Sequence, residues 1–118
     1  MSYYRIILAD DEEEIREGII RKIAWQSLGF EIAGAAENGL EALEMAERLH
    51  PDVILTDIRM PFMSGLEMAA KAAALLPSVK FIILSGYDDF EYAQKAIQLN
   101  VVEYLLKPVN AADLTKVL

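Results

Sequence analysis

Five short runs of apolar residues alternate with segments of helical periodicity along this chain. The runs cover residues 6–9, 32–36, 53–56, 81–84 and 101–106. All but the second are nearly continuous rather than alternating, which is typical of strands that are covered on both faces. The run at 32–36 has the fewest large apolar residues, so we place it at an edge of the predicted sheet.

The segments between the runs carry apolar residues at the spacing of one helix face. Ile15, Ile19 and Ile23 mark the first helix, and similar spacing covers 40–46, 66–76 and 90–97, with a fifth helix beginning near 111. Five possible capping residues each stand three positions before an acidic residue: Asp11, Asn38, Ser64, Asp88 and Asn110. Alternating strands and helices predict an α/β fold with a doubly wound parallel sheet and helices on both faces.

The composition narrows the functional classes. The chain has 118 residues, enough for one domain, and it contains no cysteine, which excludes disulfides and thiolate metal sites. Its formal net charge of -8 argues against binding nucleic acid by itself, because a phosphate backbone requires a basic surface. No apolar stretch approaches the ~20 residues of a membrane span, and no signal peptide is recognisable. We therefore expect a cytoplasmic protein that makes no contact with a membrane.

Polar residues stand at the ends of the predicted strands. Asp10 and Asp11 follow the first strand, Asp57 the third, Ser85 the fourth and Lys107 the fifth. Open α/β sheets bind ligands at the carboxyl edge, so we expect these residues to converge there. Three carboxylates, one hydroxyl and one ammonium suit a divalent cation and a phosphoryl group.

Asp57 is the candidate nucleophile of this site. We expect its carboxylate to be exposed at the strand tip, since Pro61 prevents the strand from continuing, and carboxylates can form aspartyl-phosphates. A carboxylate on Asp10 would repel that of Asp57, and a magnesium ion would relieve the repulsion. Each residue also has a plainer interpretation as a cap or turn residue, and the acidic residues 12–14 suit a helix N-terminus.

As a set, these residues resemble the motifs of the receiver domains of bacterial two-component response regulators, the CheY-like family. The matching motifs are Asp10-Asp11, Asp57 with Met60-Pro61 and Gly65, Ser85-Gly86, and Lys107-Pro108. The resemblance covers nearly the whole chain. It implies a five-stranded parallel sheet of strand order 2-1-3-4-5, as in flavodoxin-like folds.

The resemblance also implies how the metal and the phosphoryl group are held. Asp57 would be the phosphoacceptor. Mg²⁺ would be held by Asp10, Asp11, Asp57 and the backbone carbonyl of Arg59.

Three further residues would serve transfer and switching. Ser85 and Lys107 would contact the phosphoryl oxygens. Tyr104 matches an aromatic switch position whose ring turns inward when the hydroxyl of Ser85 moves toward the phosphate. The surface formed by the fourth helix, the fifth strand and the fifth helix would then change, and it is also a candidate homodimer surface.

Local stretches resemble one subgroup of this family. Residues 25–30, 83–97 and 104–109 are similar to receivers attached to AraC-type (YesN-like) DNA-binding domains. Ser64 and Asn100 depart from common family residues without affecting the chemistry. Because the chain stops within the fifth helix, we expect residues 1–118 to be the receiver domain of a longer protein whose output domain is absent here.

The expected function is therefore that of a signalling domain rather than an enzyme acting on small substrates. It would take a phosphoryl group from a sensor histidine kinase with Mg²⁺ as cofactor, and would bind DNA only through the absent output domain. Two alternatives remain: a pseudo-receiver that is never phosphorylated, and a Mg²⁺-dependent aspartyl phosphohydrolase. Against the hydrolase, Arg59 stands where a second aspartate would be needed, and no insertion encloses a substrate.

Overall fold

The computed structural model describes residues 3–86, 101–106 and 111–118. The side chains of Ser85, of strand residues 101–104 and 106, and of Asp113 and Val117 lie outside this description. The predicted fourth helix and its capping residue Asp88, as well as Asn100, Lys107 and Asn110, also lie outside the described residues.

The strands form one parallel sheet. Their bounds are β1 (Tyr4–Ala9), β2 (Phe30–Ala36), β3 (Val53–Asp57), β4 (Lys80–Ser85) and β5 (Val101–Leu106). They pair in the order β2-β1-β3-β4-β5, and every pairing is parallel. The predicted α/β fold with a parallel sheet is confirmed, and the weakest apolar run lies at a sheet edge as expected.

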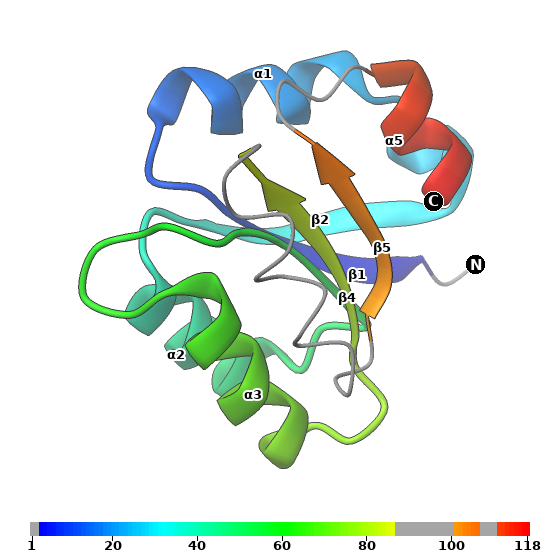
Figure 1. Ribbon diagram of the computed structural model, residues 1–118. Coiled ribbons are helices and arrows are strands. Elements are labelled where there is room, and N and C mark those ends of the chain that lie inside the picture. The colour runs from blue at the N-terminus through cyan, green and yellow to red at the C-terminus, as the bar shows by residue number, and fades with distance from the viewer. Residues whose placement is uncertain (1–2, 87–100, 107–110) are drawn as a thin grey trace.

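Helices cover both faces of this sheet. They are α1 (Glu13–Lys22), α2 (Gly39–Leu49), α3 (Gly65–Leu75) and α5 (Ala111–Val117), with a short 3₁₀ helix η1 at Gln26–Leu28. Figure 1 shows α1 and α5 on one side of the sheet and α2 and α3 on the other. Among the described residues, no helix is long and apolar enough to cross a membrane.

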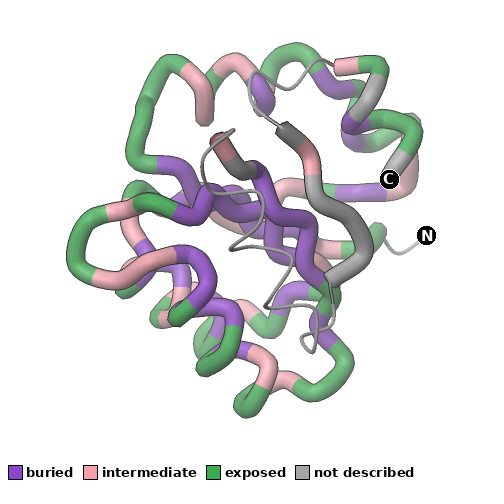
Figure 2. Tube along the Cα trace, viewed as in Figure 1, coloured by how far each residue is buried: buried purple, intermediate pink, exposed green. Residues whose placement is uncertain are grey.

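Two hydrophobic cores lie between the sheet and the helices. Ile7, Ile54 and Phe81 pack with residues of α2 and α3, whereas Leu8 and Leu55 pack with residues of α1 and α5. Each of these side chains is at most 2% exposed, and Figure 2 shows the buried residues running through the central strands. Because neighbouring strand residues point to opposite faces, burial of both faces requires continuous apolar runs.

Two predicted caps are confirmed and one is wrong. Asn38 Oδ1 accepts a hydrogen bond from the Glu41 N–H at 2.7 Å, and Ser64 caps α3 in the same way. Asp11 was expected to cap α1, but the N-cap residue is Glu12, whose side chain makes no capping bond. The Oδ1 of Asp10 accepts a hydrogen bond from the Glu12 N–H at 2.9 Å, which holds residues 10–12 in a turn, and α1 begins only after that turn.

Candidate functional site

The strand register brings the ends of the first and third strands together. β1 and β3 pair with Ala9 opposite Thr56, so Asp10 and Asp57 are the next residues on the two neighbouring chains. Neighbouring strands lie about 4.8 Å apart. The two acidic residues therefore lie side by side at the carboxyl edge of the sheet, and β4, which ends at Ser85, runs next to β3.

Asp57 is the last residue of β3 and is buried, with 6% of its surface exposed. The prediction that its carboxylate would be exposed is wrong. Its Oδ1 accepts a hydrogen bond from the Ile58 N–H at 2.8 Å, and the following loop turns back so that the Gly65 N–H donates to the Ile58 carbonyl at 2.7 Å. The loop thus closes over the strand end instead of leading away from it.

The segment after β1 forms an acidic cluster. Asp10 is 2% exposed, and its N–H donates to the Ala36 carbonyl of β2 at 3.0 Å. One carboxylate oxygen from each of Asp10, Asp11 and Glu12 lies within 4.8 Å of the other two, and Asp11 and Glu12 are exposed to solvent. Three negative groups this close repel one another unless a cation lies near them.

This oxygen-rich set fits a magnesium ion. Mg²⁺ prefers carboxylate oxygens at about 2.1 Å, so that opposite ligands lie roughly 4.2 Å apart. A separation of at most 4.8 Å between the donor atoms is close to that value. A buried carboxylate beside two exposed ones also leaves one side for water and a phosphate oxygen, as Mg²⁺ requires.

The loop between β3 and α3 is held by two glycines. A Cβ on Gly65 would lie 1.8 Å from the Asp57 carbonyl oxygen, and a Cβ on Gly39 would lie 2.1 Å from the Met63 carbonyl oxygen. Hydrogens at these positions let the loop touch both the strand end and the start of α2. This loop carries Arg59, whose side chain is exposed.

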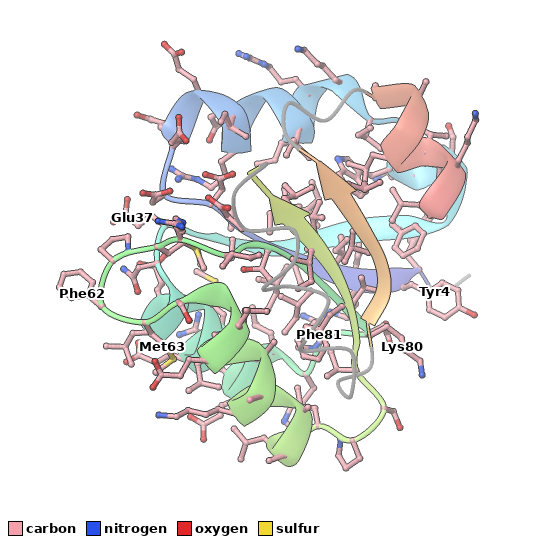
Figure 3. All side chains as sticks on the ribbon, viewed as in Figure 1. Tyr4, Glu37, Phe62, Met63, Lys80 and Phe81 are labelled. Atoms are coloured by element: carbon pink, nitrogen blue, oxygen red, sulfur yellow. The ribbon has the colours of Figure 1, made fainter. Side chains whose placement is uncertain are left out.

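Phe62 lies at the tip of the same loop in a strained conformation. It is 85% exposed and has a φ of +68°, a left-handed value that costs a residue with a Cβ about 1–2 kcal/mol. Figure 3 shows its ring pointing away from the sheet, at the same side of the molecule as Glu37, which follows β2.

Phe62→Asn should therefore stabilise the domain by about 0.5–1 kcal/mol, because Asn tolerates left-handed backbone better than Phe does. Urea unfolding of the two chains measures this difference. Phe62→Ala removes the exposed ring but keeps the strain, so its stability should stay close to that of the native chain. Equal stabilisation by both variants would attribute the gain to loss of the ring and contradict the backbone explanation.

Several predicted site residues lie partly or wholly beyond what the structure describes. Ser85 and Tyr104 are placed by their backbones in β4 and β5, but their side chains are outside the description, and so is all of Lys107. The structure gathers the carboxylates of Asp10 and Asp11 in one cluster, and the strand register sets Asp57 next to Asp10. The roles of all the predicted site residues stay predictions.

Two further residues belong to the site and were not predicted to do so. Glu12 was interpreted only as part of an acidic helix start, but its carboxylate joins the Asp10–Asp11 cluster. Arg16 was not singled out from the sequence, but its Nη1 donates to the Asp10 carbonyl at 2.8 Å. The run of acidic residues could have indicated Glu12, whereas no local signal indicates the long reach of Arg16.

Comparison with known proteins agrees with this geometry. Residues 6–118 match the family described as the response regulator receiver domain. The chain belongs to this receiver-domain family. It is 49% identical over 107 residues to the transcriptional regulatory protein YesN of Bacillus subtilis, and 42% identical over 115 residues to the transcriptional regulatory protein HptR of Staphylococcus aureus.

Solved structures place the receiver domain in the same group. The REC domain of AraT, a response regulator from Geobacillus stearothermophilus, superposes with a TM-score of 0.92 at 45% identity, covering 97% of this chain and 88% of that one. A two-component transcriptional regulator AraC from Clostridium phytofermentans gives 0.89 at 36% identity, covering 96% and 88%. The resemblance to receivers of AraC-type regulators is thereby confirmed.

The receiver domain corresponds to only part of its curated relatives. The matches to YesN and HptR span 91% and 98% of this chain, but only 29% and 45% of the two relatives. What those longer proteins do is therefore not carried by this domain alone.

Proposed function

We propose that this receiver domain accepts a phosphoryl group on Asp57 from a sensor histidine kinase, in a Mg²⁺-dependent reaction, and thereby controls an attached DNA-binding output domain. One observation carries the proposal. The register of β1 and β3 sets Asp57 beside Asp10, whose carboxylate lies within 4.8 Å of two others. A nucleophilic carboxylate beside a site for a divalent cation is what phosphoryl transfer to an aspartate requires.

The chemistry assigned to Asp57 is a displacement at phosphorus. A carboxylate oxygen forms a new P–O bond while the P–N bond of the donor phosphohistidine breaks, and the imidazole keeps the electron pair and takes a proton from solvent. The hydrogen bond from the Ile58 N–H to Oδ1 orients the carboxylate.

The metal requirement follows from charge. A phosphoryl group brings further negative charge to an edge that already holds Asp10, Asp11 and Asp57, so transfer needs a positive partner. These three carboxylates and the Arg59 carbonyl would hold Mg²⁺. When bound, the ion would neutralise charge on the phosphoryl oxygens. We assign Lys107 a similar role as a second positive group.

The output step rests on the relatives, two of which are named as transcriptional regulatory proteins. We propose that phosphate at Asp57 draws the Ser85 hydroxyl, that Tyr104 follows, and that the surface of the fourth helix, β5 and α5 passes the change to an output domain or to a second receiver. A protein of this kind would act in the cytoplasm. We assign the sheet of this domain, with its strand order β2-β1-β3-β4-β5, to the doubly wound arrangement of CheY-like receivers.

The test is incubation of this chain with acetyl phosphate, with MgCl₂ or with EDTA, followed by intact mass measurement. A gain of about 80 Da that needs Mg²⁺ is expected. No adduct from acetyl phosphate or from a phosphorylated kinase would contradict the proposal in favour of a pseudo-receiver. Multiple turnovers of small phosphate esters without an adduct would favour the phosphohydrolase instead.

A further inference from the structure

Arg16 contacts the acidic cluster from the first turn of α1. Its Nη1 donates to the Asp10 carbonyl oxygen at 2.8 Å, and this contact spans six residues of the chain. The peptide group that carries this oxygen joins Asp10 to Asp11, two of the three clustered carboxylate residues. Arg16 is half-buried, whereas Arg21 near the end of the same helix is exposed.

The position of Arg16 is unfavourable for helix stability alone. The start of a helix favours acidic residues, and α1 has Glu13 and Glu14 there. An arginine in that turn does not interact favourably with the helix dipole, but it brings a permanent positive charge next to the cluster. Because the carbonyl and the carboxylate belong to the same residue, a guanidinium bonded to the Asp10 carbonyl lies within the ~8 Å of the Asp10 carboxylate over which charges act at physiological salt.

We propose that Arg16 is a built-in counter-ion of the Asp10–Asp11–Glu12 cluster in the metal-free domain, and that it opposes Mg²⁺ binding once the ion is present. The inference rests on the proposed function, because it takes this cluster as the metal site. Arg16 is thus a positioning residue that makes the site stable without metal and lowers its affinity for metal.

Two effects of Arg16 on the metal could compete. Its hydrogen bond could organise the ligands and so raise the affinity for Mg²⁺, or its charge could compete with the ion and lower it. Asp10 is held independently by the bond from its N–H to the Ala36 carbonyl and by the bond from the Glu12 N–H to Oδ1. Because these contacts fix Asp10 without Arg16, the charge effect outweighs the organising effect.

Thermal unfolding and calorimetric Mg²⁺ titration of Arg16→Gln test this inference. Without divalent cation the variant should melt roughly 5 °C below the native chain, and most of that loss should disappear at saturating Mg²⁺. By linkage, its dissociation constant for Mg²⁺ should be about fivefold lower than that of the native chain. Arg16→Lys keeps the charge, so its Mg²⁺ affinity should stay near the native value.

Arg21→Gln is the matched control, since it removes an exposed arginine from the same helix; its melting temperature should respond to Mg²⁺ as the native chain does. A loss of stability in Arg16→Gln that is the same with and without Mg²⁺ would show only a helix brace and overturn the inference. Weaker Mg²⁺ binding in Arg16→Gln would overturn it too, in favour of ligand organisation. If the native chain itself binds no Mg²⁺, the metal-dependent function fails first, and the inference with it.

Discussion

Asp57→Asn should abolish the Mg²⁺-dependent mass gain of about 80 Da in acetyl phosphate. An amide oxygen is a poor nucleophile, so no aspartyl-phosphate can form at this position. The substitution preserves the shape of the side chain, and the amide oxygen can still accept the bond that the Ile58 N–H gives to Oδ1. The fold should therefore persist, and loss of the adduct reports on chemistry rather than on unfolding.

The stability of Asp57→Asn adds a second readout. Asp57 is only 6% exposed and lies beside the buried Asp10. Removing one of two neighbouring buried charges relieves repulsion, so the melting temperature in EDTA should equal or exceed that of the native chain. Glu47→Gln, an exposed acid on α2, is the matched control and should keep the full adduct. An adduct that persists in Asp57→Asn would show that another residue accepts the phosphoryl group.

Gly65→Ala should destabilise the domain by about 3 kcal/mol, at the high end of overpacking effects. The new methyl group would lie 1.8 Å from the Asp57 carbonyl oxygen and 2.9 Å from its carbonyl carbon. Backbone atoms cannot rotate away as a side chain can, so either β3 or α3 has to move. Chemical denaturation measures the loss, and the rate of adduct formation should fall with it, because the clash is with the backbone of Asp57 itself.

Gly18→Ala is the matched control for this prediction. Gly18 lies inside α1, and a Cβ there would have no atom within 4 Å. Ala is favoured over Gly in a helix interior, so this variant should gain about 0.5–1 kcal/mol and keep its adduct. If both alanine variants change stability by similar amounts in the same direction, then the close contact at Gly65 is not what requires glycine there.

Local patterns in the sequence predicted most of the secondary structure. The apolar runs at 53–56 and 81–84 fall inside β3 and β4, which extend them by one or two residues, and the run at 101–106 is β5 itself. The caps Asn38 and Ser64 form as predicted because a cap bonds a backbone N–H only three residues away. Such interactions depend on nearby residues, so a single sequence is enough to infer them.

The errors arose where distant segments interact. Asp11 is not the cap because Asp10, whose N–H donates to the Ala36 carbonyl of another strand, also accepts the Glu12 N–H. These bonds hold residues 10–12 in a turn, so the helix begins one residue later than predicted. Asp57 was expected to be exposed because a strand followed by proline has no local reason to be covered. The loop turns back because Gly65 lies against the backbone of Asp57 and because Gly39, 24 residues earlier in the chain than Met63, lies against the backbone of Met63.

By itself, the sequence determined the order of strands and helices, two of the helix caps and the residues that end the strands, and with them the receiver resemblance. The tertiary structure alone decided that Asp57 is buried and that Arg16 lies against the Asp10 carbonyl. The physical reason is the distance along the chain over which each kind of interaction acts. Periodicity and capping act over a few residues, whereas burial and charge at the sheet edge depend on elements that only folding brings together.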